Sequence, residues 1–190
     1  MRKLIVCNFM SLDGYYEGPQ HDVMALPFDP TFDEYNVERV RTADTLLLGA
    51  TSYAQMMEFW PPLADDPGAS PVEQEIGRFQ RDAAKVVISD TLVDGDVVAF
   101  PATVVRRADA ADHVRRLKEA PGRDVLVFAS HLVWNPLLAA GLVDELHLMV
   151  GNAAIGGGTP LFTGPTPRLR LLDVRTYPGF DNPVLRYACG

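Results

Sequence analysis

Four short segments of small and polar residues, each placed directly after an apolar run, are the part of this sequence best suited to binding a ligand. They comprise residues 11–14, 49–52, 89–91 and 129–131. Small residues let a ligand approach backbone N–H groups, and the partial positive charge at the start of a following helix suits a phosphate. Since the carboxyl ends of neighbouring strands in an α/β sheet form one crevice, four such ends predict an extended ligand. The same segments also suit tight turns without a ligand, and this alternative stays open.

The sequence carries no motif for several other kinds of catalysis. Its four histidines lack metal-ligand spacing and its two cysteines form no C-x-x-C pair, so we expect no metal site. The G-x-S-x-G turn of hydrolases, the Walker-type phosphate loop and a Rossmann glycine fingerprint after the first apolar run are also missing. The strand ends are therefore the strongest functional signal.

The composition indicates one domain over residues 1–190. A chain of 190 residues with 47% hydrophobic side chains can bury a sizeable core. The net charge of -8 and the pI near 4.9 leave no basic stripe for a phosphate backbone, so we expect no nucleic-acid partner. No apolar run reaches the roughly 20 residues that span a bilayer, and no signal-peptide pattern precedes the first strand. We therefore expect a cytoplasmic protein without membrane contact.

Alternating apolar runs and helical spacings predict the elements that position these segments. Strands are expected at residues 3–10, 46–48, 85–88, 97–100 and 103–105, and helices at 31–41, 51–59, 72–79 and 110–119. Residues 125–150 are typical of a strand–helix–strand unit, and 169–176 with 184–188 of an antiparallel hairpin at the sheet edge. This order predicts an α/β domain with a mixed sheet.

Local signals predict three boundaries. Thr31 followed by Glu34 predicts a capping box at the start of the helix over 31–41. Two prolines after Trp60 predict the end of the helix over 51–59. Residues 15–30 hold glycine and several prolines, and they are expected to form a long loop over a strand end.

Four of these segments together resemble the dihydrofolate reductase-like family, which includes the C-terminal reductase domain of riboflavin biosynthesis. The segments are NFMSLDG at 8–14, LLGATSY at 47–53, KVVISDTL at 85–92, and GLVDEL at 141–146 with IGGG at 155–158. They occur in the family's order and span nearly the whole chain. The resemblance implies a three-layer fold with a central, mostly parallel mixed sheet, helices on both faces and an antiparallel C-terminal hairpin. It also implies NADPH as cofactor, hydride transfer to a heterocycle, and a homodimer.

The resemblance assigns the cofactor to three strand ends. The implied cofactor-binding residues are Gly49, Ala50, Thr51, Ser52, Ser89, Asp90, Thr91, Phe128, Ala129, Ser130, His131 and Leu132. Two positions depart from the family, which usually has arginine at position 50 and glycine at position 129. Because arginine suits bidentate phosphate recognition, its loss should weaken a preference for NADPH and leave NADH possible. An alanine costs closeness of backbone approach without abolishing it.

Reduction of such a heterocycle needs a proton source, and a buried carboxyl with a raised pKa can supply it. The candidates are Asp13, in the loop after the first strand, and Asp33, about as far before Gly49 as the folate enzymes place their acid. Asp13 equally suits an Asx turn, and Asp33 suits an exposed first-turn carboxylate better than a catalytic acid. The expected substrate-binding residues, some of which equally suit a core stripe, are Asn8, Met10, Tyr53, Met57, Trp60 and Met149.

Two functional hypotheses follow. The first is an NAD(P)H-dependent reductase that transfers a hydride to a small planar heterocycle, such as a pteridine- or pyrimidine-like compound. The alternative is a non-catalytic, dimeric dinucleotide- or small-molecule-binding protein that keeps the reductase fold, which the alanines at positions 50 and 129 would suit. The substrate itself is not specified by the residues.

Overall fold

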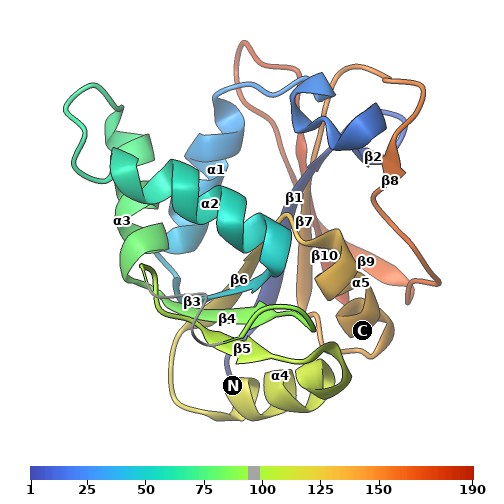
Figure 1. Ribbon diagram of the computed structural model, residues 1–190. Coiled ribbons are helices and arrows are strands. Elements are labelled where there is room, and N and C mark those ends of the chain that lie inside the picture. Colours follow the sequence, from blue (N-terminus) through green and yellow to red (C-terminus); the bar gives the residue numbers. More distant parts are fainter. Residues whose placement is uncertain (94–98) are drawn as a thin grey trace.

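A single eight-stranded sheet forms the centre of the molecule (Figure 1). The computed structural model describes residues 1–93 and 99–190. The strands follow the order β5-β4-β3-β6-β1-β7-β10-β9. Their bounds are β1 (Leu4–Met10), β3 (Ala43–Gly49), β4 (Ala84–Ile88), β5 (Thr103–Val105), β6 (Asp124–Phe128), β7 (Glu145–Val150), β9 (Leu169–Arg175) and β10 (Val184–Cys189). A separate two-stranded ribbon joins β2 (Tyr15–Glu17) to β8 (Thr159–Pro160).

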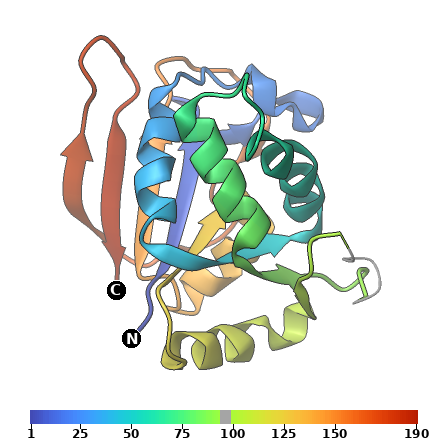
Figure 2. The same ribbon diagram turned by 90° about the vertical axis from the view of Figure 1, so that its left-hand side faces the viewer.

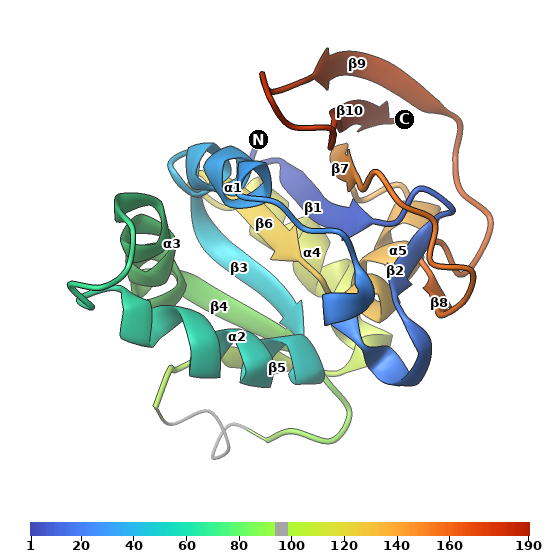
Figure 3. The ribbon, with the colours of Figure 1, turned by 90° about the horizontal axis from the view of Figure 1, so that it is seen from above.

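Helices cover both faces of this sheet, which gives the three layers predicted from the sequence (Figure 3). One face carries α1 (Thr31–Val40), α2 (Ala50–Leu63) and α3 (Pro71–Asp82), and the other carries α4 (Ala110–Glu119) and α5 (His131–Ala139). Val37, Met57 and Ile76 join the core of the first face, whereas Val114 and Trp134 join that of the second. Among the described residues, no helix has the length and apolar character needed to cross a bilayer.

The strands from β5 to β7 run parallel, and the C-terminal hairpin is antiparallel. Val86 of β4 pairs with Thr103 of β5 in parallel register, and Leu4 of β1 pairs with Val125 of β6 in the same sense. β10 runs antiparallel to β7 and to β9, so the expected edge hairpin is confirmed. Figure 2 shows this hairpin at one edge of the molecule, beyond α1.

The segment over residues 15–30 is less irregular than expected. It contains β2 and two short 3-10 turns, η1 (Pro19–His21) and η2 (Val23–Ala25). The ribbon partner of β2 lies about 140 residues further along the chain, so local sequence reading could not find the pairing. The strand expected at 97–100 falls partly on residues outside the described ones, and residues 99–100 form a bend.

The start of α1 at Thr31 is confirmed, but the capping box predicted there and the predicted end of the helix over 51–59 are wrong. Thr31 does not cap α1, because the Asp29 carboxylate accepts hydrogen bonds from the Thr31 N–H and hydroxyl; the true capping box joins Ser70 to Glu73 at α3. α2 continues through both prolines to Leu63. The cause is tertiary packing: a Cβ on Gly77 of α3 would lie 2.6 Å from the Trp60 carbonyl oxygen, so α3 lies directly against this last turn.

Candidate functional site

The carboxyl ends of β3, β4 and β6 meet at one rim of the sheet. Gly49 at the end of β3 pairs with Ile88 at the end of β4. The Gly49 N–H donates to Ser130 Oγ at 3.1 Å, and the Ser130 N–H donates to Ser52 Oγ at 3.2 Å. These two bonds tie the start of α2 to the start of α5, so two helix N-termini lie side by side at the rim.

A cavity of about 500 Å³, here called the rim cavity, opens between these helix starts. Ten of the twelve expected cofactor-binding residues line it, namely Gly49, Ala50, Thr51, Ser52, Ser89, Asp90, Thr91, Ser130, His131 and Leu132. Neither α2 nor α5 has a side-chain cap at its N-terminus. Because the first N–H groups of a helix lack partners within the helix, the rim cavity fits the phosphates of a dinucleotide.

The turn between β6 and α5 has a backbone conformation that favours glycine, the residue that the family resemblance implies at position 129. Ala129 and Ser130 adopt left-handed backbone conformations, with φ of 50° and 55°. Such conformations are strained by about 1 kcal/mol for residues with a Cβ. The structure retains them because Ser130 bonds to both neighbouring segments. The sharp turn therefore forms without the glycine.

Arg107, which the sequence analysis missed, supplies a cationic group to the rim cavity. It begins η4 (Arg107–Asp109), two residues after the end of β5. Its backbone N–H donates to Asp90 Oδ1 at 3.0 Å, and its Nε lies 3.6 Å from Asp90 Oδ2. The strand-end pattern could have found it, since β5 ends at the same rim. Arg107 therefore offers a positive charge to the cavity that Ala50 also lines, the position at which the family resemblance implies an arginine.

A second cavity of about 480 Å³, here called the aromatic cavity, adjoins the first. Its aromatic lining comes from Phe9, Tyr16, Phe28, Phe32, Phe59, Trp60 and Phe128. Tyr16, Val23 and Gln55 line both cavities, so the two meet at these residues. Tyr16 also lies against His131, with 4.5 Å between the ring centroids. A ligand in the rim cavity can thus reach a second ligand in the aromatic cavity.

Asp33 lines the aromatic cavity from the first turn of α1. Burial, together with the charge of Glu73, raises the pKa of Asp33 to about 6. Its carboxyl group forms no hydrogen bond with the described residues. A carboxyl in this state can hold a proton near neutral pH and donate it to a bound ligand.

Asp13 has a different environment and lines neither cavity. Its carboxylate accepts hydrogen bonds from the Ser11 hydroxyl at 2.6 Å and from the Ile155 and Gly156 N–H groups at 3.1 and 2.8 Å. The pKa of Asp13 is lowered, and the hydrogen bond from the Ser11 hydroxyl is the largest cause. The structure therefore does not bring the expected catalytic Asp13 to either cavity, and its carboxylate ties two loops together.

The remaining expected residues divide between the aromatic cavity and the core. Asn8 and Trp60 line the aromatic cavity, as do Phe128 and Ala129, which were expected at the cofactor. Met10, Tyr53, Met57 and Met149, which were also expected at the substrate, line neither cavity. Tyr53, Met57 and Met149 are core residues, and Met10 packs against the core, because one face of α2 and alternate residues of β1 and β7 turn toward the neighbouring layer.

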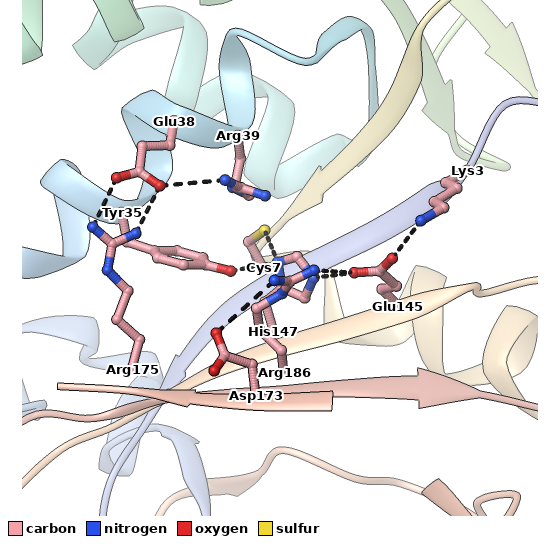
Figure 4. Close-up of polar contacts among 10 residues, drawn as sticks. All are labelled: Lys3, Cys7, Tyr35, Glu38, Arg39, Glu145, His147, Asp173, Arg175 and Arg186. Atoms are coloured by element: carbon pink, nitrogen blue, oxygen red, sulfur yellow. Dashed lines mark hydrogen bonds and ion pairs between the residues drawn. The ribbon is translucent and has the colours of Figure 1, made fainter. Parts of the chain in front are cut away.

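A network of polar contacts ties α1 to the sheet (Figure 4). The Tyr35 hydroxyl of α1 bonds to His147 Nδ1, and His147 Nε2 bonds to Glu145 at 2.9 Å. Arg175 of β9 forms two bonds of 2.7 and 2.8 Å to Glu38 of α1. The helix that carries Asp33 is therefore fixed to two strands of the sheet, β7 and β9.

The chain belongs to the RibD C-terminal domain family, whose sequence profile matches residues 2–179. Among curated proteins, it is similar to the uncharacterized protein YyaP of Bacillus subtilis (strain 168). The two are 27% identical over 175 residues, which cover 92% of this chain and 88% of YyaP.

Solved structures show the same fold. A putative riboflavin biosynthesis protein from Shewanella sp. PV-4 superposes with a TM-score of 0.69 at 17% identity, covering 98% of both chains. A diaminohydroxyphosphoribosylaminopyrimidine deaminase/5-amino-6-(5-phosphoribosylamino)uracil reductase from Thermotoga maritima gives 0.68 at 12% identity, with all of this chain covering 57% of that one. A pyrimidine reductase-like protein from Corynebacterium diphtheriae gives 0.61 at 16% identity, covering 98% of this chain and 91% of that one.

Proposed function

We propose that this protein is an NAD(P)H-dependent reductase that transfers a hydride to a small planar heterocycle. The observation that supports this most strongly is the junction of two cavities. One is built from two uncapped helix starts, and the other is an aromatic chamber containing a carboxyl with a raised pKa. Membership of the RibD C-terminal domain family and the name of the Thermotoga enzyme support reductase chemistry.

In this proposal, separate groups of residues bind the cofactor, shield the reacting pair and supply the proton. The N–H groups at the starts of α2 and α5 hold the phosphates, and Arg107 adds a positive charge on the side of β5. NADPH, when bound, supplies the hydride. Tyr16, at the junction of the cavities, shields the reacting pair from water. Asp33 holds a proton on its carboxyl oxygen and gives it to the ring atom that gains negative character.

Cofactor binding provides the test. Adding NADPH should raise the melting temperature, because a ligand that binds only the folded state stabilises it, and should quench tryptophan fluorescence through Trp60. NADP⁺ and NADH serve as comparison ligands. Absence of both signals at cofactor concentrations of about 1 mM would rule the proposal out, since that concentration exceeds ordinary cofactor dissociation constants.

We also propose that the expected homodimer forms through β9. This strand ends the sheet, and Leu171, Leu172 and Val174 are exposed on it. An exposed edge strand with apolar side chains tends to pair or to be covered. A second copy of the same chain would cover it on both molecules at once.

A further inference from the structure

The lining of the rim cavity holds more carboxylates than permanent cations, although the ligand proposed for it is an anion. Glu17 and Asp90 contribute two carboxylates, and Arg107 is the one arginine or lysine among the described lining residues. Arg107 is paired with Asp90, since its Nε lies 3.6 Å from Asp90 Oδ2, so it leaves the charge of Glu17 unbalanced. A diphosphate in this cavity would therefore be repelled unless another group supplies positive charge.

Glu17 is a buried carboxylate at the end of β2. Its side chain is 10% exposed, its Oε1 accepts a hydrogen bond from the Thr159 hydroxyl at 2.7 Å, and the same oxygen lies 2.6 Å from His21 Nδ1. Burial alone would raise the pKa of Glu17, but the hydrogen bonds to His21 and Thr159 outweigh burial and hold this pKa below its usual range. Glu17 therefore stays ionised at neutral pH and favours a proton on a neighbouring histidine.

His131, the first residue of α5, lines the same cavity and has ring nitrogens without a partner. Its ring packs against Tyr16, with 4.5 Å between the ring centroids, and neither nitrogen bonds to the described residues. Burial lowers the pKa of His131 below the ordinary 6.5, more than the charge of Glu17 raises it. Burial also raises the pKa of Tyr16 to about 12, so Tyr16 stays neutral. The His131 ring is therefore mostly neutral at pH 7 and can take up a proton.

We infer that the rim cavity binds the diphosphate of a dinucleotide together with one proton, and that the His131 ring holds this proton. An anion beside the ring favours its charged form and adds to the attraction of Glu17, so binding draws a proton from the solvent. The imidazolium then donates to a phosphate oxygen at the start of α5, where the first helix N–H groups lack partners. This role of His131 rests on the proposed function, because it concerns the cofactor cavity.

Calorimetric titration of ADP-ribose in two buffers of different ionisation enthalpy measures the proton. ADP-ribose has the diphosphate bridge but not the 2′-phosphate of NADPH, a group that itself titrates near about pH 6. The observed enthalpy at pH 7 should differ between the buffers in the sense of proton uptake, and ADP-ribose should bind about fivefold more tightly at pH 6 than at pH 8. NADH should behave in the same way. Enthalpies that do not depend on the buffer, or an affinity that does not change with pH, would overturn the inference.

A pair of histidine variants assigns the proton to one ring. His131→Gln should remove both effects, because glutamine can donate to a phosphate but does not titrate, and its affinity at pH 8 should stay within about twofold of the parent. His113→Gln is the matched control, since His113 is a half-buried histidine of α4 whose pKa is also lowered by burial, and it lies outside the cavity lining. Proton uptake that persists in His131→Gln, or that is lost equally in His113→Gln, would overturn the assignment to His131.

Parallel titrations with ADP-ribose and the nicotinamide cofactors separate this inference from the proposed function. If ADP-ribose binds with proton uptake while neither NADH nor NADPH binds, the reductase proposal fails and the role of His131 stands. If the nicotinamide cofactors bind without proton uptake, the role of His131 is wrong and the reductase proposal stands. Binding of none of the three would overturn both. The buffer comparison on the unmodified protein keeps the test decisive even if a variant does not fold.

Discussion

The Tyr35 hydroxyl lies 2.9 Å from His147 Nδ1 and bonds to it, and this contact fixes the protonation state of a histidine that is 1% exposed. Because the Glu145 carboxylate accepts at Nε2, the neutral ring carries its proton there and receives the Tyr35 O–H at Nδ1. Burial outweighs the neighbouring carboxylate and lowers the pKa of His147 to about 4. The helix carrying Asp33 is therefore anchored by a histidine that stays neutral at pH 7.

Replacing His147 should change how stability depends on pH. The folded pKa is lower than the ordinary 6.5, so the unfolded chain binds the proton first, and the protein loses stability as pH falls from 6.5 toward 4. His147→Gln removes this loss, on the order of 2–3 kcal/mol. The free energy of unfolding of the parent minus that of His147→Gln should therefore decrease as pH falls from 6.5 to 4, and urea titrations at several pH values measure it. A constant difference, or the same change in His21→Gln at an exposed site, would contradict the account.

Asp33→Asn should stabilise the protein at neutral pH. The raised pKa means that the unfolded chain loses its proton first as pH rises, so the carboxyl costs stability progressively between pH 3.8 and about 6. Asp33→Asn should therefore raise the free energy of unfolding by about 1–3 kcal/mol above pH 6 and leave it unchanged below pH 3.8. Melting temperatures across this range measure the effect. Glu34→Gln, at an exposed neighbouring position, is the control that should show no such gain.

Arg107→Ala should weaken NADPH more than NADH. Arg107 is an exposed arginine held at the rim cavity by Asp90, and a charge-assisted bond to phosphate contributes about tenfold in affinity. Arg106→Ala is the matched control, because Arg106 is exposed and outside the cavity lining. Ala50→Arg should act in the opposite direction and tighten NADPH by about 1–2 kcal/mol. Titrations with NADPH and NADH measure these affinities. If Arg107→Ala and Arg106→Ala changed them equally, the placement of a phosphate beside Arg107 would be wrong.

Leu171→Lys should convert the proposed dimer to a monomer. A lysine on an edge strand opposes pairing with another strand, and Leu171 is half exposed on β9. Light scattering after gel filtration measures the mass. Leu12→Lys, at an exposed loop position away from β9, should keep the mass of the parent. A monomeric parent protein, or a dimer that survives Leu171→Lys, would remove β9 as the interface.

The sequence predicted the rim better than the aromatic cavity, and the reason is physical. A strand end is a local pattern, so residues 49–52 and 89–91 could be placed from apolar runs and the small residues after them. Asn36 and Gln80 meet only because α1 and α3 pack beside each other, which no local pattern encodes. Met57 lies in the core for a related reason: helical periodicity predicts which face of a helix is buried, but it does not distinguish the core from the wall of a pocket.

The most direct test of the account is a titration of NADPH into the parent protein and Thr51→Glu. Thr51 is exposed in the first turn of α2 and lines the rim cavity. A carboxylate there suits the helix dipole, so folding should be preserved, but it repels phosphate. We predict saturable NADPH binding by the parent, weakened at least about tenfold by Thr51→Glu and unchanged in Ala54→Glu, whose site lies outside the cavity lining. Equal binding by all three proteins, or none by the parent, would contradict the account.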